Sequence, residues 1–158
     1  MKLRPLTQSD AKACAEVFYQ AVHIGAQSHY TQEQRFAWAP SAMDIDLSAY
    51  ITTGFSLGAT RFGRLVGFFV MGDDGHIDFA YVLPNEMGKG TARALYEACE
   101  AEARAKGLEV IDTQASHLAK RFLEKRGWRV TAQQVIIRNG VGIENFRMEK
   151  DLSARDKT

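Results

Sequence analysis

The stretch from Val82 to Leu95, VLPNEMGKGTARAL, constrains most strongly how this chain can fold. An apolar strand end leads through Pro84 and a turn with two glycines, Gly88 and Gly90, directly into a helical pattern. A glycine pair at a helix start lets another group approach the backbone without meeting a Cβ atom. The first amides of a helix have no partner within it, and the helix dipole is positive there, so the stretch predicts an anion site. A purely structural turn is the alternative.

Two phosphate-binding motifs fail here on their spacing. A Walker loop places its lysine directly before a serine or threonine, but Gly90 separates Lys89 from Thr91. The dinucleotide fingerprint has Arg93 in place of its third glycine, and a strand meander precedes the turn where a βαβ unit is needed. Both nucleotide readings are therefore disfavoured.

The rest of the chain alternates between helical and strand patterns. Capping signals at Thr7 and Thr31 each precede an amphipathic segment, and Asn139-Gly140 is a strong two-residue hairpin signal. Strands are expected at residues 2–6, 55–61, 64–71, 76–83, 108–113, 128–138 and 141–150. Helices are expected after Thr7, after Thr31, over 44–51, from Thr91 to Lys106 and after Ser116. This order predicts an α/β (α+β) fold with a mixed, mostly antiparallel sheet, helices on both faces and a C-terminal β-hairpin.

Composition excludes several classes of protein. A chain of 158 residues, 46% hydrophobic and 25% charged, suits a single ordinary globular domain over residues 1–158. The net charge of +1 offers no argument for a nucleic-acid partner, and no apolar run approaches the ~20 residues that span a membrane. The start MKLRPLTQSD lacks the pattern of a secretory signal. Cys14 and Cys99 lie on apolar helix faces, as expected for buried thiols in a reducing cytoplasm.

A resemblance adds to this interpretation. The segment VLPNEMGKGTARALYEACEAEARAKG is similar to the acyl-CoA-binding segment of the GNAT superfamily of N-acetyltransferases, which has a V-x-P strand end and then Q/R-x-x-G-x-G/A before a helix. The later SHLAKRFLEKRGW resembles the family's helix before a terminal hairpin. HYTQEQRFAWA and RNGVGIENFRMEK further resemble a bacterial branch typified by YafP. The resemblance touches most of the chain and is strongest from residue 76 onwards.

The resemblance implies that acetyl-CoA is the co-substrate. Backbone of Tyr81 and Val82 would pair with the pantetheine arm like an extra strand, and backbone amides of the glycine turn would hold the pyrophosphate. The turn residues concerned are Met87, Gly88, Lys89, Gly90, Thr91 and Ala92.

An acyltransferase acting on an amine needs a base, because an alkyl ammonium stays protonated until about pH 10. The family often has an acidic residue at the strand position of Asp78, which makes Asp78 the candidate catalytic base. A carboxylate tied to a neighbouring arginine is the alternative. Strand alternation places Asp78 with Ala80 and Val82 on one face, opposite Ile77. His76 shares the face of Asp78, but it directly follows a turn and is interpreted as an exposed histidine.

Three positions depart from the family pattern. Met87 stands where Gln or Arg opens the glycine motif, and Ser116 stands where Asn is frequent. Leu123 occupies the position of the tyrosine that protonates the departing thiolate in many members. These departures leave the acid of the reaction unassigned.

His29, Tyr30 and Trp38 are candidates for binding the amine acceptor, because the first helices overhang the acceptor pocket in the fold that the resemblance implies. An aromatic and imidazole cluster can bind an amine by cation–π contacts or hydrogen bonds, and aromatic packing on the sheet is the alternative. No spacing of His, Cys and carboxylates indicates a metal site.

The sequence thus predicts a cytoplasmic, acetyl-CoA-dependent N-acetyltransferase that acts on a small-molecule or peptide amine by direct attack in a ternary complex. No nucleic acid or membrane is expected as a partner, and a homodimer is possible through the hairpin and the sheet edge. A coenzyme A-binding sensor without catalysis is the main alternative, and a nucleotide-binding enzyme is a third.

Overall fold

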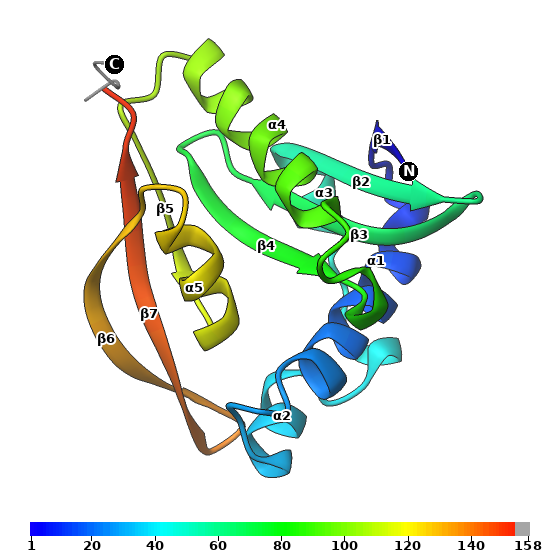
Figure 1. Ribbon diagram of the computed structural model, residues 1–158. Coiled ribbons are helices and arrows are strands. Elements are labelled where there is room, and N and C mark those ends of the chain that lie inside the picture. Colours follow the sequence, from blue (N-terminus) through cyan, green and yellow to red (C-terminus); the bar gives the residue numbers. More distant parts are fainter. Residues whose placement is uncertain (154–158) are drawn as a thin grey trace.

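The structure is a computed structural model that describes residues 1–153; the last five residues of the domain expected over 1–158 lie outside the described residues. A seven-stranded sheet runs through the molecule (Figure 1). Its strands are β1 (Lys2–Pro5), β2 (Phe55–Arg61), β3 (Arg64–Met71), β4 (His76–Val82), β5 (Val110–Ala115), β6 (Arg129–Arg138) and β7 (Val141–Asp151). Their order in the sheet is β1-β2-β3-β4-β5-β7-β6. Neighbouring strands are antiparallel except for β4 and β5, which are parallel.

The helices cover both faces of this sheet (Figure 1). They are η1 (Gln8–Asp10), α1 (Ala11–Gln20), η2 (Ala21–Gly25), α2 (Gln32–Trp38), η3 (Ala42–Asp44), α3 (Ser48–Thr53), η4 (Pro84–Glu86), α4 (Thr91–Ala105) and α5 (His117–Glu124). One core cluster joins α4 and α5 to the sheet, and a second joins α1 and α3 to the opposite face. The predicted mixed fold with helices on both faces is confirmed.

Local signals placed several boundaries correctly. Thr31 and Gln34 form a capping box in which the Thr31 hydroxyl accepts from the Gln34 amide at 3.1 Å. Asn139 and Gly140 form the turn between β6 and β7, with φ angles of 49° and 78° that suit a tight hairpin turn. A cap or a tight turn depends on contacts between residues close in the chain, so it can be predicted without knowing the rest of the fold.

Two elements begin later than the sequence predicts. The helix expected from residue 44 begins at Ser48, whose amide donates to the Asp46 carboxylate at 3.0 Å. The strand expected from residue 108 begins at Val110, because the Leu108 amide donates to the Ala103 carbonyl at 3.1 Å and closes the end of α4. In both places a local hydrogen bond holds the preceding residues in a turn, so they do not join the helix or the strand that the apolar pattern predicted for them.

A β-bulge in β4 overturns the predicted alternation of its side chains. Met71 pairs with Ile77 and Val70 pairs with Phe79, so Asp78 is an extra residue in the strand. Ile77 therefore faces the α4 side of the sheet together with Ala80, where strict alternation had placed it on the other side. Because of the bulge, Asp78 has no partner residue on β3, and it lies next to the two residues of β4 that pair with β5.

Both cysteines are fully buried, as the sequence predicts. Burial raises the pKa of the Cys14 thiol to about 12 and that of the Cys99 thiol to about 12. Thiols with such pKa values stay protonated at neutral pH, so neither residue is a nucleophile.

Candidate active site

The parallel strands β4 and β5 separate soon after they meet. Only His76 with Asp112 and Ile77 with Thr113 are paired between them, and the Thr113 hydroxyl donates to the Ile77 carbonyl at 2.7 Å. Beyond this point the two strands diverge (Figure 1), and the edge of β4 over residues 78–82 has no strand partner on the β5 side among the described residues. The sheet is therefore open in its middle.

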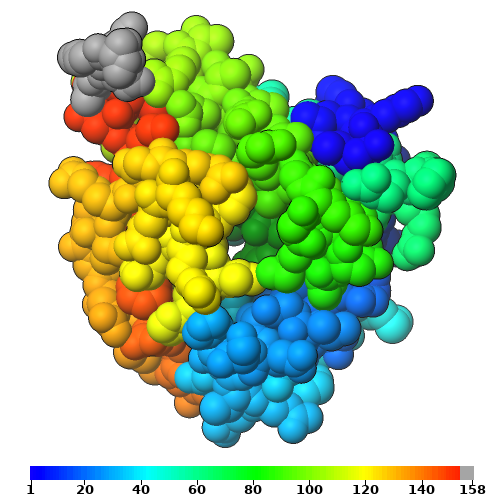
Figure 2. Space-filling view, in the orientation of Figure 1, coloured from blue at the N-terminus to red at the C-terminus, as the bar shows by residue number. Residues whose placement is uncertain are grey.

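A cavity of about 840 Å³ occupies this opening on the α4 and α5 side and is called the larger cavity. Its walls come from β4, the turn before α4, the end of β5 and one face of α5. Figure 2 shows the surface hollowed between the green turn region and the yellow α5. Several cationic side chains line it: Lys89, Arg93, Arg121, Lys125 and Arg126. The larger cavity thus suits a long ligand with negative charge.

A buried carboxylate holds the turn that borders the larger cavity. The Glu86 side chain is 3% exposed, and it accepts hydrogen bonds from Arg61 at 3.1 Å and from the Thr91 hydroxyl at 2.7 Å. Burial on its own raises the pKa of Glu86, but the hydrogen bonds from Arg61 and Thr91 bring it below the ordinary value. The Thr91 side chain is therefore turned inward, beneath the turn.

The start of α4 presents free amide groups. Gly88 and Gly90 have φ angles of 81° and 85°, which favour glycine. Among the described residues no acceptor pairs with the amides of Gly88, Gly90, Thr91 and Ala92. A Cβ atom added at Gly88 would meet nothing within 4 Å, so the space above the turn is open. Free amides at a helix start with open space above them are the features expected of the anion site that the sequence predicts.

A second cavity of about 430 Å³ lies on the opposite side of the sheet and is called the smaller cavity. Residues of α1, α3, β4 and the β6–β7 hairpin enclose it. Both cavities are lined by the same six residues at the gap between β4 and β5: Trp38, Ile77, Asp78, Tyr81, Gln114 and Ser116. Two molecules that enter from opposite faces of the sheet can therefore meet at this junction.

Asp78 lies at the junction beside a histidine held by a second carboxylate. The Nε2 atom of His76 is 3.8 Å from Oδ1 of Asp78, and its Nδ1 atom is 3.0 Å from Oδ1 of Asp112. The Asp78 side chain is 29% exposed, so it is not enclosed as the sequence had suggested. Burial raises the pKa of Asp78, His76 lowers it, and the nearby Asp74 and Asp112 raise it. No arginine pairs with Asp78 in the part of the chain that the structure describes.

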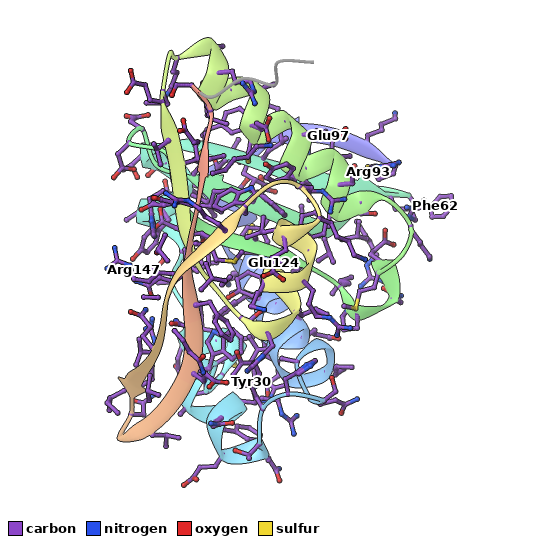
Figure 3. The ribbon with its side chains drawn as sticks, turned by 60° about the vertical axis from the view of Figure 1, so that its left-hand side comes forward. Tyr30, Phe62, Arg93, Glu97, Glu124 and Arg147 are labelled. Atoms are coloured by element: carbon purple, nitrogen blue, oxygen red, sulfur yellow. The ribbon has the colours of Figure 1, made fainter. Side chains whose placement is uncertain are left out.

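The three residues expected to bind the acceptor lie in different settings. Trp38 lines both cavities, and its ring centroid lies 5.2 Å from that of Tyr30. Tyr30 lines the smaller cavity between α2 and β7 (Figure 3), and its hydroxyl donates to the Glu144 carbonyl at 2.8 Å. His29 lines neither cavity and stacks on His117 with ring centroids 5.1 Å apart. The structure brings Trp38 and Tyr30 to the site and leaves His29 outside it.

The residues expected to hold the cofactor lie together, with one exception. Tyr81, Val82, Met87, Gly88, Lys89, Gly90 and Ala92 all line the larger cavity. Thr91 is fully buried beneath the turn. Leu123 is 5% exposed and lines the same cavity, where its side chain has no proton to give.

Several residues of the site were missed by sequence reasoning. Asp112, Gln114, Arg138 and Asn145 were not singled out, and His76 was interpreted as an exposed turn residue. His76 and Asp112 meet because β4 pairs with β5, and the hairpin that carries Arg138 and Asn145 reaches the site because β7 pairs with β5. No local pattern marks such a residue, so only the register of the sheet identifies it.

Comparison with known proteins agrees with this geometry. The chain matches the acetyltransferase (GNAT) domain family over residues 26–152. It is 27% identical to the N-acetyltransferase YafP of Escherichia coli over 151 residues, which cover 94% of each chain. A crystal structure of a GCN5-related N-acetyltransferase from Rhodopseudomonas palustris is 31% identical with a TM-score of 0.86, covering 95% of this chain and 94% of the other. PaiA N-acetyltransferase from Thermoplasma acidophilum, solved with coenzyme A, has the same fold with a TM-score of 0.73 and 20% identity, covering 95% and 98%.

The fold, the open sheet and the glycine turn define an acyltransferase that uses a coenzyme A thioester. The chain belongs to the GNAT acetyltransferase family, and its activity is that of an acetyl-CoA-dependent N-acetyltransferase. The family assignment made from the sequence is confirmed.

The described residues show neither a metal-binding cluster nor a helix that could span a membrane. Among residues 1–153, no group of three or more His, Cys, Asp or Glu side chains is arranged to hold a metal ion. Within the same residues, no helix combines the length and the apolar character needed to cross a membrane.

Proposed function

We propose that this enzyme transfers the acetyl group to a primary amine that enters the smaller cavity, by direct attack while acetyl-CoA occupies the larger one. The observation that supports this most is the junction of the two cavities at Asp78. Two ligands that meet through the open sheet need no covalent enzyme intermediate, because their reacting groups are held next to each other. Both cysteines are buried and protonated, which agrees with direct transfer.

The residues of the larger cavity fit acetyl-CoA. The unpaired amides from Gly88 to Ala92 would hold the pyrophosphate at the positive end of α4. The backbone edge of β4 at Tyr81 and Val82 would pair with the pantetheine arm, since β5 leaves it free. Lys89 and Arg93 line the same cavity and would add positive charge near the phosphates. When bound, acetyl-CoA supplies an activated acyl group with a thiolate as leaving group.

Asp78 would take the proton from the amine. An ammonium group cannot attack a carbonyl carbon, and a positioned base contributes roughly 10²- to 10⁴-fold to such a reaction. Because burial raises its pKa, Asp78 is a stronger base than an ordinary carboxylate. His76 lies between Asp78 and Asp112, and because its Nε2 atom is 3.8 Å from Oδ1 of Asp78, a bridging water would carry the proton between them.

The remaining roles are divided among backbone and side chains. A backbone N–H near Val82 would polarise the thioester carbonyl, as in an oxyanion hole. Leu123 offers no acid for the leaving thiolate, but a thiol with a pKa near ~8.5 needs little help to leave. Tyr30 and Trp38 would form part of the acceptor site, which takes a small-molecule or peptide amine, and His29 would act only at its margin.

A catalytically weak sensor of acyl-CoA is the second candidate. Leu123 in place of an acid favours it, as does Met87, a 45% exposed residue of the larger cavity where the family has a hydrogen-bond donor. Such a protein would bind acetyl-CoA with the same amides but would transfer nothing.

Two measurements test the proposed function. Calorimetry should show binding of acetyl-CoA and none of ATP, and a protein that binds only ATP is not an acetyltransferase. Release of free thiol should then be followed with alkylamines, polyamines, amino acids and peptides. Binding without amine-dependent thiol release across the panel would favour the sensor.

A further inference from the structure

The smaller cavity has the size of a site for a compact molecule, and its walls combine aromatic rings with polar side chains. Its volume of about 430 Å³ falls in the range of small-molecule sites. Aromatic rings form much of its lining: Phe18 and Tyr81 have centroids 4.8 Å apart, and Tyr50 and Phe79 have centroids 5.0 Å apart. An acceptor with a flat apolar body would fill this space.

A buried amide in the same cavity lacks a partner. Asn145, on β7, is 9% exposed and lines the smaller cavity, and its Oδ1 atom has no hydrogen-bond donor among the described residues. A buried acceptor without a donor costs about 1–3 kcal/mol. An amine that enters the cavity carries the N–H groups that such an oxygen needs.

A free cation lies at the hairpin end of the cavity. Arg138, the last residue of β6, lines it, and no carboxylate of the described residues pairs with the guanidinium. Arg138 is exposed and lies where the hairpin end of the cavity opens to solvent. Glu144 also lines the cavity, but it is engaged by His117, whose Nε2 atom is 2.6 Å from its Oε1 atom.

The two polar groups are separated along the hairpin. Asn145 pairs with Gln134, and Arg138 lies four residues further along β6. At about 3.3 Å of rise per residue, the backbone of Arg138 is about 13 Å along the hairpin from the backbone of Asn145. The amine and the group that meets Arg138 must therefore be at opposite ends of the acceptor.

We propose that the acceptor is a small zwitterion, with its amine at Asn145 and Asp78, an apolar or aromatic body, and a carboxylate or similar anion that pairs with Arg138. This inference rests on the proposed function. A polyamine fits less well, because its distal cation would meet Arg138. A peptide fits less well because the cavity is compact.

The test compares 4-(aminomethyl)benzoate with benzylamine, which differ only in the carboxylate. The expected kcat/KM is about 10- to 100-fold higher for the benzoate, as expected for a charge-assisted pair, and Arg138→Gln should remove most of that preference. Arg138→Lys should retain part of it. Arg147→Gln is the matched control, because Arg147 is exposed on neighbouring β7 and lines neither cavity (Figure 3).

A second variant separates binding from a structural role. Asn145→Leu removes an oxygen that has no partner, so the midpoint of urea unfolding should not fall. The KM for 4-(aminomethyl)benzoate should rise at least tenfold in the same variant. A lower midpoint with an unchanged KM would mean that Asn145 supports the fold, and the inference would be wrong.

The remaining outcomes distinguish this inference from the proposed function. Equal turnover of the two amines, a preference that survives Arg138→Gln, or acetylation only of spermidine or a peptide would overturn the zwitterion class and leave the acetyltransferase intact. Binding of acetyl-CoA with no transfer to any of these amines would overturn both.

Discussion

The Nε2 atom of His76 lies 3.8 Å from Oδ1 of Asp78, across a bulge in β4. The imidazole is held from its other side by Asp112 at 3.0 Å. His76 is 35% exposed, so this chain of three groups runs from the junction of the cavities to solvent. In the proposed role of Asp78 as a base, this arrangement would link its carboxylate with solvent.

The first prediction concerns Asp78 itself. Asp78→Asn should lower kcat at pH 7 by about 10²- to 10³-fold, because the amine then has no base beside it. The affinity for acetyl-CoA, measured by calorimetry, should stay within a factor of two or so, since the amides of the glycine turn are untouched. Asp44→Asn, at an exposed carboxylate outside both cavities, is the control. Full activity of the Asp78 variant would remove that residue from the base role.

The second prediction concerns the pH dependence of the reaction. In its proposed role as base, Asp78 acts only when ionised, so the acid limb of kcat/KM should follow its pKa, which lies above the ordinary value of 3.8 because of burial. His76 lowers this pKa, so His76→Gln should move the limb to higher pH. Asp74 raises it, so Asp74→Asn should move the limb to lower pH. Shifts of the same sign in both variants would show that another group controls the limb.

The third prediction concerns the glycine turn. Gly90→Asp should weaken acetyl-CoA binding at least 100-fold, because a carboxylate would compete with the phosphates for the free amides. Gly63→Asp is the control for backbone strain, since Gly63 also has a positive φ of 78° with nothing within 4 Å of an added Cβ atom. If both variants bind acetyl-CoA as the wild type does, the amides do not form the pyrophosphate site.

The fourth prediction concerns the buried Glu86. Glu86→Gln should lower the free energy of unfolding at pH 7 by about 1–3 kcal/mol, because Arg61 and Thr91 lose a charged acceptor. The folded-state pKa of Glu86 lies below the unfolded value of 4.5, so its stabilisation is complete above pH 4.5 and is lost as the pH falls further. Urea unfolding at several pH values measures this, with Glu97→Gln, on the exposed side of α4, as the control (Figure 3). A difference that grows in acid would contradict the assignment.

The fifth prediction concerns the ion pair that fixes the start of η1. Asp10 accepts from Arg4 at 2.9 Å and from the Thr7 amide at 2.8 Å. The hydrogen bond from Arg4 and the contacts with Thr7 lower the pKa of Asp10 to about 2, although burial opposes this. A double-mutant cycle with Arg4→Gln and Asp10→Asn should give a coupling of about 0.5–1 kcal/mol at pH 7. The coupling should decrease as the pH falls from about 4 towards 2, and a constant value would exclude an ionic contribution.

The turn residues that line the larger cavity could be predicted from the sequence, as could Tyr30 and Trp38 in the smaller one, whereas the pairing around Asp78 could not. The residues of the glycine turn are neighbours in the chain, and the helix that follows orients their amides. His76 and Asp112, by contrast, are 36 residues apart and meet only because β4 and β5 pair for two residues. His29 was predicted for the acceptor site together with Tyr30 and Trp38, but only the latter two line the smaller cavity.

The sequence alone determined the order of helices and strands, the caps, the hairpin turn and the anion site before α4. Each of these depends on hydrogen bonds and φ angles within a few residues, so the local chemistry is sufficient. Only the tertiary structure decided that Asp78 lies in a bulge, that β4 and β5 separate beyond it, and that Asn145 and Arg138 face the same cavity. These features depend on the register between strands distant in the chain, and a shift of one residue would move every side chain to the opposite face.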